Sequence, residues 1–360
     1  MLAAVVFLLS ACGERPPAEH DSVLNLFIWS DYLAPDTLRS FEEATGIKTR
    51  VLYFDTNETL ETQLLAGSSG FDVVLPSAPY FERQITAGAY QTLDKRKLPS
   101  LGNLDPGLMS LVARYDPGNM HGIIYLWGTE GLGYNEARIK RLVPDVAIDS
   151  WGLIFDPKIA AKLAPCGIHV LDNPAGVTRI VLRYLGRDPN APSSSDLSDA
   201  ERTLLAIRPF IHSIDSSPYI GALANGDICV ALSYNGDVAQ ARDRARVSKN
   251  GIDVKFVVPK EGGIIWFDIV AIPKAAPNPA SAYAFLEHVL KPRVMAGISN
   301  SVRYANANAA AAPFMSDAIL HDPVIYPTPE ERERLFIQLA DPGDRARMLT
   351  RIWQRFKTGQ

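Results

Sequence analysis

Hydrophobic and polar positions alternate along this chain in a pattern that predicts strands and helices in turn. The first unit occupies residues 24–46. There a short apolar run predicts a strand, a polar turn follows, and Leu38 and Phe41 share one face of a predicted helix. Gly46 suits the left-handed C-terminal stop of that helix. Residues 47–53 alternate in polarity and predict a second strand. Together these elements predict a βαβ unit, in which ligands bind at the carboxyl ends of the strands.

The alternation continues through the rest of the chain and predicts an α/β fold. Residues 71–76 predict a buried parallel strand, because they are continuously apolar after Asp72, and Ser77 follows at its carboxyl end. Residues 121–135 hold two apolar runs broken by glycines, and we interpret them as a strand and hinge that cross between two domains. Residues 259–263 predict a second crossing. Further strands are predicted at residues 168–171, 228–233, 254–258 and 266–273, with helices between them.

The composition is that of an ordinary globular protein with room for two domains. The chain has 360 residues, of which 47% are hydrophobic and 21% are charged. Its net charge is −4 and its basic residues are scattered, which argues against a nucleic-acid-binding protein. No apolar run reaches the length of about 18 residues that a transmembrane helix requires.

The N-terminal residues predict export. Residues 1–11 predict a signal peptide, because an apolar segment precedes small residues. Residues 9–12 (LSAC) resemble the bacterial lipobox, in which Cys12 becomes the lipidated first residue of the mature chain. An ordinary signal peptide with an incidental cysteine is the alternative, since no Lys or Arg precedes the apolar run. Residues 12–22 predict a polar tether. The sequence therefore predicts a periplasmic protein that reaches the membrane only through a lipid anchor.

Export changes the interpretation of the two remaining cysteines, Cys166 and Cys229. In an oxidising compartment such a pair is usually a disulfide. Neither lies in a CxxC motif or beside a histidine, which argues against metal binding or catalysis. The sequence therefore predicts a disulfide between them.

Candidate binding chemistry appears at the end of the first predicted strand. The turn there carries two rings, a hydroxyl and a carboxylate: Trp29, Ser30, Asp31 and Tyr32. Rings attract an organic cation through their faces, and a carboxylate supplies the counter-charge. Asp268 is a further candidate, because it interrupts an apolar strand and is costly to bury without a partner. A structural pairing with Arg303 is the alternative to a ligand.

Motifs for enzymatic chemistry do not occur in the sequence. There is no GxSxG elbow, P-loop, HExxH or EF-hand loop, and the six histidines lack the spacing of metal ligands. We therefore expect no enzyme, no cofactor and no metal.

Several long motifs from Leu24 to the C-terminus carry a family resemblance. They include WSDYLAPDT, GFDVVLPSAPYFERQ, SWGLIFDP, LANGDICVA, WFDIVAIP and RYANAN. In these motifs the chain closely resembles the polyamine-binding proteins of bacterial ABC importers, the putrescine- and spermidine-binding periplasmic proteins. The resemblance implies a monomeric, two-lobed type II periplasmic binding protein that closes over its ligand. We expect lobe 1 to comprise residues 23–126 and 262–300, and lobe 2 residues 127–261 and 301–360.

The resemblance also implies a set of ligand-binding side chains. Carried over position by position, the set is Trp29, Ser30, Asp31, Tyr32, Ser77, Tyr234, Asp237, Trp266, Asp268 and Tyr304. The implied function is capture of polyamines and their delivery to the permease subunits of an ABC transporter. An amine sensor that signals to a membrane receptor, and an exported enzyme on the same fold, are the alternatives.

One departure from the family concerns the choice of ligand. Putrescine-binding members carry a further glutamate just after the stretch that here reads Leu171-Asp172-Asn173-Pro174. Ala175 and Gly176 occupy that place in this chain. We therefore expect an organic amine as ligand, with the individual amine left open between putrescine, spermidine, another amine length and a ligand with a single ammonium group.

Overall fold

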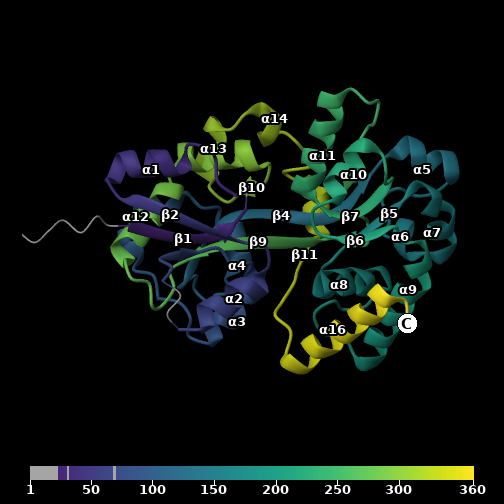
Figure 1. The fold of residues 1–360 in the computed structure, drawn as a ribbon, viewed down its shortest axis with the longest axis horizontal. Coiled ribbons are helices and arrows are strands. Elements are labelled where there is room, and N and C mark those ends of the chain that lie inside the picture. The colour runs from purple at the N-terminus through teal and green to yellow at the C-terminus, as the bar shows by residue number, and fades with distance from the viewer. Residues whose placement is uncertain (1–22, 31, 68–69) are drawn as a thin grey trace, which may run out of the picture.

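The computed structural model describes residues 23–360 except 31 and 68–69. It shows two α/β halves joined by long strands that run through both (Figure 1). The predicted signal peptide, Cys12, the tether at residues 12–22 and the side chain of Asp31 lie outside the described residues. Within the described part, no helix combines the length and apolar character that crossing a bilayer requires.

The N-terminal half contains a parallel three-stranded unit in the order β2-β1-β3. As the pattern predicts, α1 ends at Gly46, which adopts a left-handed φ of 72°. The elements of this half are β1 (Val23–Trp29), α1 (Thr37–Thr45), β2 (Lys48–Phe54), α2 (Asn57–Leu65), β3 (Val73–Val74), α3 (Ala78–Thr86), α4 (Pro106–Val112), α12 (Pro279–Val289), α13 (Pro292–Val302), β10 (Ala305–Asn306) and α14 (Asp317–Leu320).

The second half repeats the α/β pattern around β7 and β5. Its elements are α5 (Glu136–Leu142), α6 (Gly152–Phe155), α7 (Pro157–Leu163), β5 (Ile168–Leu171), α8 (Pro174–Tyr184), α9 (Ser194–Ile207), β6 (Ser213–Asp215), α10 (Tyr219–Asn225), β7 (Val230–Tyr234), α11 (Asn235–Ser248), β8 (Lys255–Val257) and α16 (Gly343–Thr358). Strands β5 and β7 are parallel, so the helices that follow them, α8 and α11, both begin at the same edge of the sheet.

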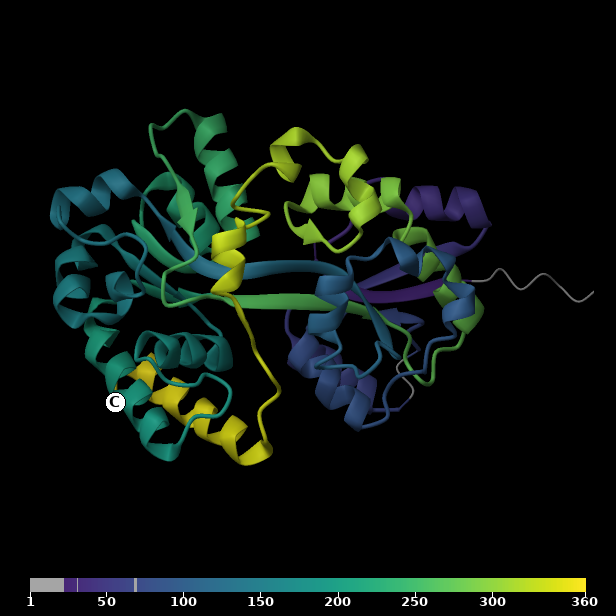
Figure 2. The same ribbon diagram turned by 180° about the vertical axis from the view of Figure 1, so that it is seen from behind.

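Two antiparallel strands, β4 (Gly122–Tyr134) and β9 (Ile264–Ala271), connect the halves. β4 pairs with β9 up to Thr129 and then with β7 from Glu130 onward, so it changes partner where the halves meet. Gly263 is required at this junction, because a Cβ there would lie 2.3 Å from the carbonyl oxygen of Glu130. A third connection leads from α15 (Pro329–Glu333) and β11 (Phe336–Ile337) to α16, drawn in yellow in Figure 2.

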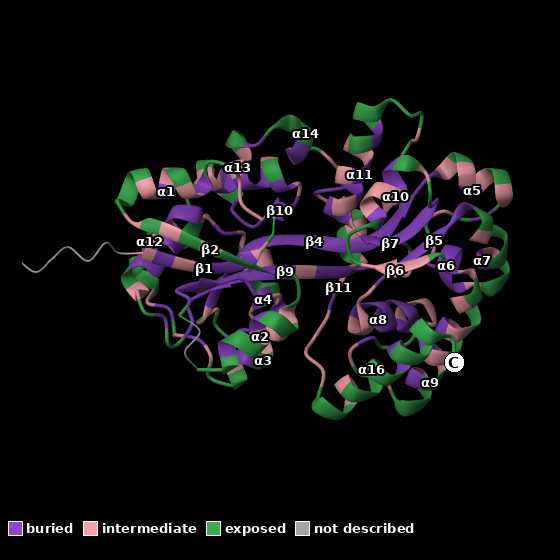
Figure 3. Cartoon of the chain, in the orientation of Figure 1, coloured by how far each residue is buried: buried purple, intermediate pink, exposed green. Residues whose placement is uncertain are grey.

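Two hydrophobic cores lie on either side of this junction, and the strands between them are buried along almost their whole length (Figure 3). The expected boundaries assign residues 301–360 to lobe 2. The buried side chains from Val302 to Ile337 pack in the first core, and only those from Leu349 to Phe356 join the second. We therefore propose that lobe 1 extends to about residue 337. The hydrophobic pattern around residue 300 is continuous and does not mark this boundary.

The predicted disulfide is confirmed. Cys166 and Cys229 are bonded with their Cα atoms 5.4 Å apart, and both side chains are buried in the second core. The bridge ties the residue two positions before β5 to the residue that precedes β7, so it reinforces the pairing of these parallel strands at their amino ends.

We expect the protein to show no free thiol at these positions when it is isolated from an exporting host. The reason is that an oxidising compartment retains a buried disulfide of this kind. Thiol labelling of the denatured protein, followed by mass spectrometry of its peptides, would test this. Labelling of both cysteines before reduction would contradict it.

Candidate functional site

Asp268 is the charged residue in the centre of β9, and two hydroxyl groups hold its carboxylate. The Tyr32 hydroxyl donates to Oδ2 at 2.6 Å and the Ser77 hydroxyl donates to Oδ1 at 2.7 Å. Asn57, at the start of α2, positions Ser77, since its Oδ1 accepts from the Ser77 N–H and its Nδ2 donates to Oγ. The site is therefore assembled from the carboxyl ends of β1 and β3 together with β9.

Asp268 has no basic partner in the described part of the chain. Arg303, the structural alternative, forms an ion pair with Asp243 at 3.3 Å. Burial raises the pKa of Asp268 to about 6, although the hydrogen bonds from Ser77 and Tyr32 oppose this shift. The site thus stabilises an anion with neutral donors, and no basic side chain among the described residues pairs with it, as a cation-binding site would require.

Asp237 forms a second hydrogen-bonded carboxylate, in the first turn of α11. The hydroxyl groups of Tyr219 and Tyr304 each donate to it at 2.7 Å. Burial raises its pKa, and the two tyrosine hydrogen bonds oppose the shift. Burial and the neighbouring Asp237 raise the pKa of Tyr304, so this tyrosine remains a protonated donor at neutral pH. Asp237 and Asp268 are therefore held in the same way.

Aromatic rings connect the two carboxylates. The ring of Trp266 lies edge-on to that of Tyr304, with centroids 5.0 Å apart, and to that of Tyr234 at 6.1 Å. Tyr32 lies 6.2 Å from Tyr304. Tyr32 and Tyr304 thus each bind a carboxylate and contact the other's ring, which joins Asp268 and Asp237 into one site.

The remaining candidates lie at the end of β1. Trp29 packs against Phe54 with ring centroids 4.4 Å apart, and Ser30 is exposed in the following turn. Neither takes part in the two hydrogen-bonded groups around Asp268 and Asp237. Asp31 lies outside the described residues, so its role stays a prediction.

The structure adds one carboxylate that sequence reasoning missed. Glu130 lies on β4 opposite Tyr234 and is only 2% exposed. Its Oε1 accepts from the amide of Asn173 at 3.3 Å, and its Oε2 is buried without a partner among the described residues. Burial raises its pKa to about 8. Glu130 interrupts an apolar strand as Asp268 does, and this is the sequence signal that identifies it as a candidate.

Tyr219, Asn57 and Asn173 were also missed. Each supports another side chain of the site, and none stands out in the sequence. Among the residues that the structure describes, no group of acidic, histidine or cysteine side chains could hold a metal ion.

A cavity of about 650 Å³ lies on the opposite face of the connecting strands. It is lined by Trp127 and Ile265, which alternate along β4 and β9 with Gly128 and Trp266. The cavity is therefore separate from the site around Asp268.

Comparisons with known proteins agree with this architecture. The chain is 48% identical to the putrescine-binding periplasmic protein PotF of Escherichia coli, over 95% of this chain and 93% of that protein. It is 45% identical to the putrescine-binding periplasmic protein SpuD of Pseudomonas aeruginosa, over 100% of this chain and 98% of that protein. A solved structure of a putative spermidine/putrescine ABC transporter from Listeria monocytogenes superposes with a TM-score of 0.83 at 29% identity. That alignment covers 94% of this chain and all of the other.

These neighbours confirm the predicted two-lobed fold of the type II periplasmic binding proteins. The family model described as "Bacterial extracellular solute-binding protein" matches residues 37–327. That match covers most of both lobes and every described site residue from Ser77 to Tyr304. The chain therefore belongs to the bacterial extracellular solute-binding protein family.

Proposed function

We propose that this protein captures polyamines of the putrescine and spermidine class outside the cytoplasm and delivers them to the permease subunits of an ABC transporter. The observation that carries the proposal is the pair Asp268 and Asp237. Both carboxylates are held by neutral hydroxyl donors, both lack an ion pair within the described residues, and aromatic rings lie between them. The names of the relatives PotF and SpuD support the same ligand class.

The chemistry of a polyamine matches this arrangement. Its ammonium groups would supply the missing positive charges, and its methylene groups would contact the rings of Trp266 and Tyr304. At an effective dielectric constant of about 20, a pair of charges 4 Å apart contributes about 4 kcal/mol before desolvation. Micromolar affinity requires about 8 kcal/mol, so two such pairs and some ring contact reach it in order of magnitude.

Binding would be coupled to closure of the two lobes. The strands β4 and β9 form two of the connections between the lobes, and the segment that leads to α16 forms the third. Bending at the ends of these connections would open the site around Asp237 and Asp268 to admit the ligand and close it again. A permease would then recognise the closed form. We further propose that the protein acts in the periplasm as a monomer, attached to the membrane through lipidated Cys12.

Thermal unfolding of the purified full-length protein tests the proposed ligand class. Because a ligand that binds only the folded state stabilises it, putrescine or spermidine at one hundred times its Kd should add about 2.7 kcal/mol of stability. We expect a rise in Tm with these amines and none with neutral or acidic amino acids. A rise with acidic amino acids, or none with any amine, would contradict the proposal.

A further inference from the structure

Glu130 is a buried carboxylate on the same face of the sheet as the proposed polyamine site. In an antiparallel pair, residues directly opposite each other point to one side, as do residues i and i+2 of one strand. Trp266 lies opposite Gly128, two residues before Glu130, and Glu130 lies opposite Tyr234. A Cβ on Gly128 would meet the Trp266 ring at 2.3 Å, which places this face against the aromatic residues of the site.

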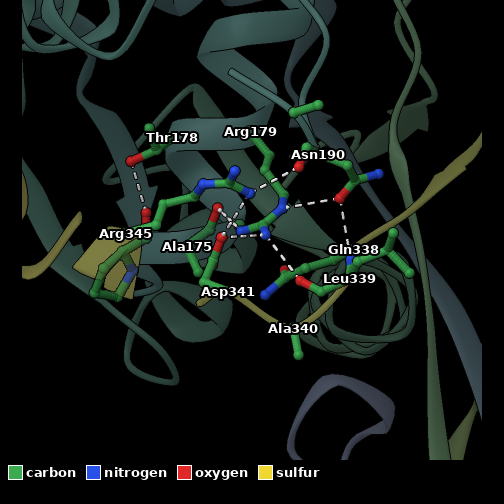
Figure 4. A network of polar contacts seen from close by, with 12 residues as sticks. Ala175, Thr178, Arg179, Asn190, Gln338, Leu339, Ala340, Asp341 and Arg345 are labelled. Carbon is green, nitrogen blue, oxygen red and sulfur yellow. Dashed lines mark hydrogen bonds and ion pairs between the residues drawn. The ribbon is translucent and has the colours of Figure 1, made fainter. Parts of the chain in front are cut away.

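No basic side chain in the described part of the chain forms an ion pair with Glu130, and Arg179 only partly opposes the rise in its pKa that burial causes. Arg179 on α8 is the nearby basic residue, and its guanidinium is occupied elsewhere (Figure 4). It forms an ion pair with Asp341 at 2.8 Å, donates to the carbonyl oxygens of Ala175 and Leu339, and donates to the side chain of Asn190. Among the described residues, Glu130 accepts one hydrogen bond, from Asn173, and its second oxygen is buried without a partner.

The position of Asn173 links Glu130 to the missing family glutamate. Asn173 caps α8, where its Oδ1 accepts from the N–H of Gly176 while its amide group donates to Glu130. Ala175 and Gly176 are the residues that stand in place of that glutamate. The first turn of α8 therefore lacks the family's glutamate, and Glu130 on the neighbouring β4 supplies a carboxylate beside it.

We propose that Glu130 binds the ammonium group of the polyamine that lies farthest from Asp268, in place of the carboxylate lost at Ala175 and Gly176. The proposal rests on the polyamine-binding function proposed above. Asp268 lies opposite Leu126, four residues from Glu130 on β4. At about 3.3 Å per residue, the Cα atoms of Asp268 and Glu130 are therefore about 13 Å apart along the strands. Even with the reach of both side chains, such a span favours an amine at least as long as putrescine.

The variant Glu130→Gln tests the role of the charge while keeping the shape and the hydrogen bond from Asn173. In calorimetric titrations of the full-length protein, we expect affinity for putrescine and spermidine to fall ten- to hundredfold. Affinity for butylamine, which has a single ammonium group, should change no more than twofold. Glu136→Gln, which removes an exposed carboxylate paired with Lys255 in the same lobe, is the control for net charge and should bind as the native protein does.

A second variant distinguishes the loss of a charge at Glu130 from a disturbance of the structure. If Glu130→Gln weakens binding because a charge is lost, Glu130→Gln combined with Ala175→Glu should regain at least part of the affinity for spermidine. Equal weakening of all three amines, or of none, would overturn the role of Glu130. If the native protein itself binds none of the amines, the proposed function fails, and this outcome is distinct from the others.

Discussion

Replacing Asp268 by asparagine is expected to weaken polyamine binding by about 2–5 kcal/mol, the cost of leaving an ammonium group unpaired in a closed site. Asparagine keeps the size of the side chain. Its Oδ1 can accept from one of the two hydroxyl groups that now donate to Asp268, those of Tyr32 and Ser77, and its Nδ2 can donate to the oxygen of the other. The stability of the ligand-free protein should be unchanged or slightly higher, because Asp268 is buried without a basic partner among the described residues. Calorimetric titration and thermal unfolding of the same samples would measure both effects.

Asp72 offers a matched control in the same lobe. It is also fully buried, but its carboxylate accepts backbone N–H groups from Asn25 and Asn278, and it lies at the amino end of β3. Asp72→Asn should lower stability and leave the affinity of the folded protein intact. If Asp268→Asn instead behaved like this control, with lower stability and native affinity, Asp268 would be a structural residue.

The hydrophobic pattern was sufficient to predict most of the fold, because burial follows directly from it. Three elements lie where the pattern places them. Helix α1 ends at Gly46 in the left-handed conformation, β5 occupies residues 168–171, and β4 is the long strand that crosses between the lobes. The lobe boundary was harder to place, because both lobes use the same kind of apolar helix. Only long-range packing shows that the buried residues from Val302 to Ile337 join the first core.

The candidate site could be predicted where a charge interrupts an apolar strand or where a motif resembles the family. Asp268 met both conditions. Glu130 met only the first, and the motif GTEGLGYN that contains it was interpreted from its glycines. The hydrogen bond from Asn173, 43 residues away in the sequence, has no local signature. Side chains that orient others through such distant contacts therefore emerge only from the fold.

The pH dependence of binding should follow from the buried carboxylates. An ammonium group requires an ionised carboxylate, and amines with a pKa of about 10 stay protonated near neutral pH. The pKa of Glu130 is raised to about 8 and that of Asp268 to about 6, in each case chiefly by burial; Arg179 and Asn173 oppose the first shift. The stability of the folded protein depends on pH in the opposite sense. Because the pKa values of Glu130 and Asp268 are higher in the folded than in the unfolded chain, these two groups stabilise the fold at low pH. That stabilisation is lost as the pH rises through 6 and 8.

We therefore expect polyamine affinity to be highest above pH 8 and to fall by up to about tenfold per pH unit below it, more steeply below pH 6, where Asp268 also takes up a proton. Calorimetry in buffers of different ionisation enthalpy should detect proton release on binding at pH 7. In Glu130→Gln the decline should begin only near pH 6, because the group that titrates at higher pH has been removed. In Glu136→Gln it should begin where it does in the native protein. An affinity that stays constant from pH 9 to pH 5 in the native protein would show that neither Glu130 nor Asp268 contacts the ammonium groups, since a carboxylate that binds a cation must first lose its proton.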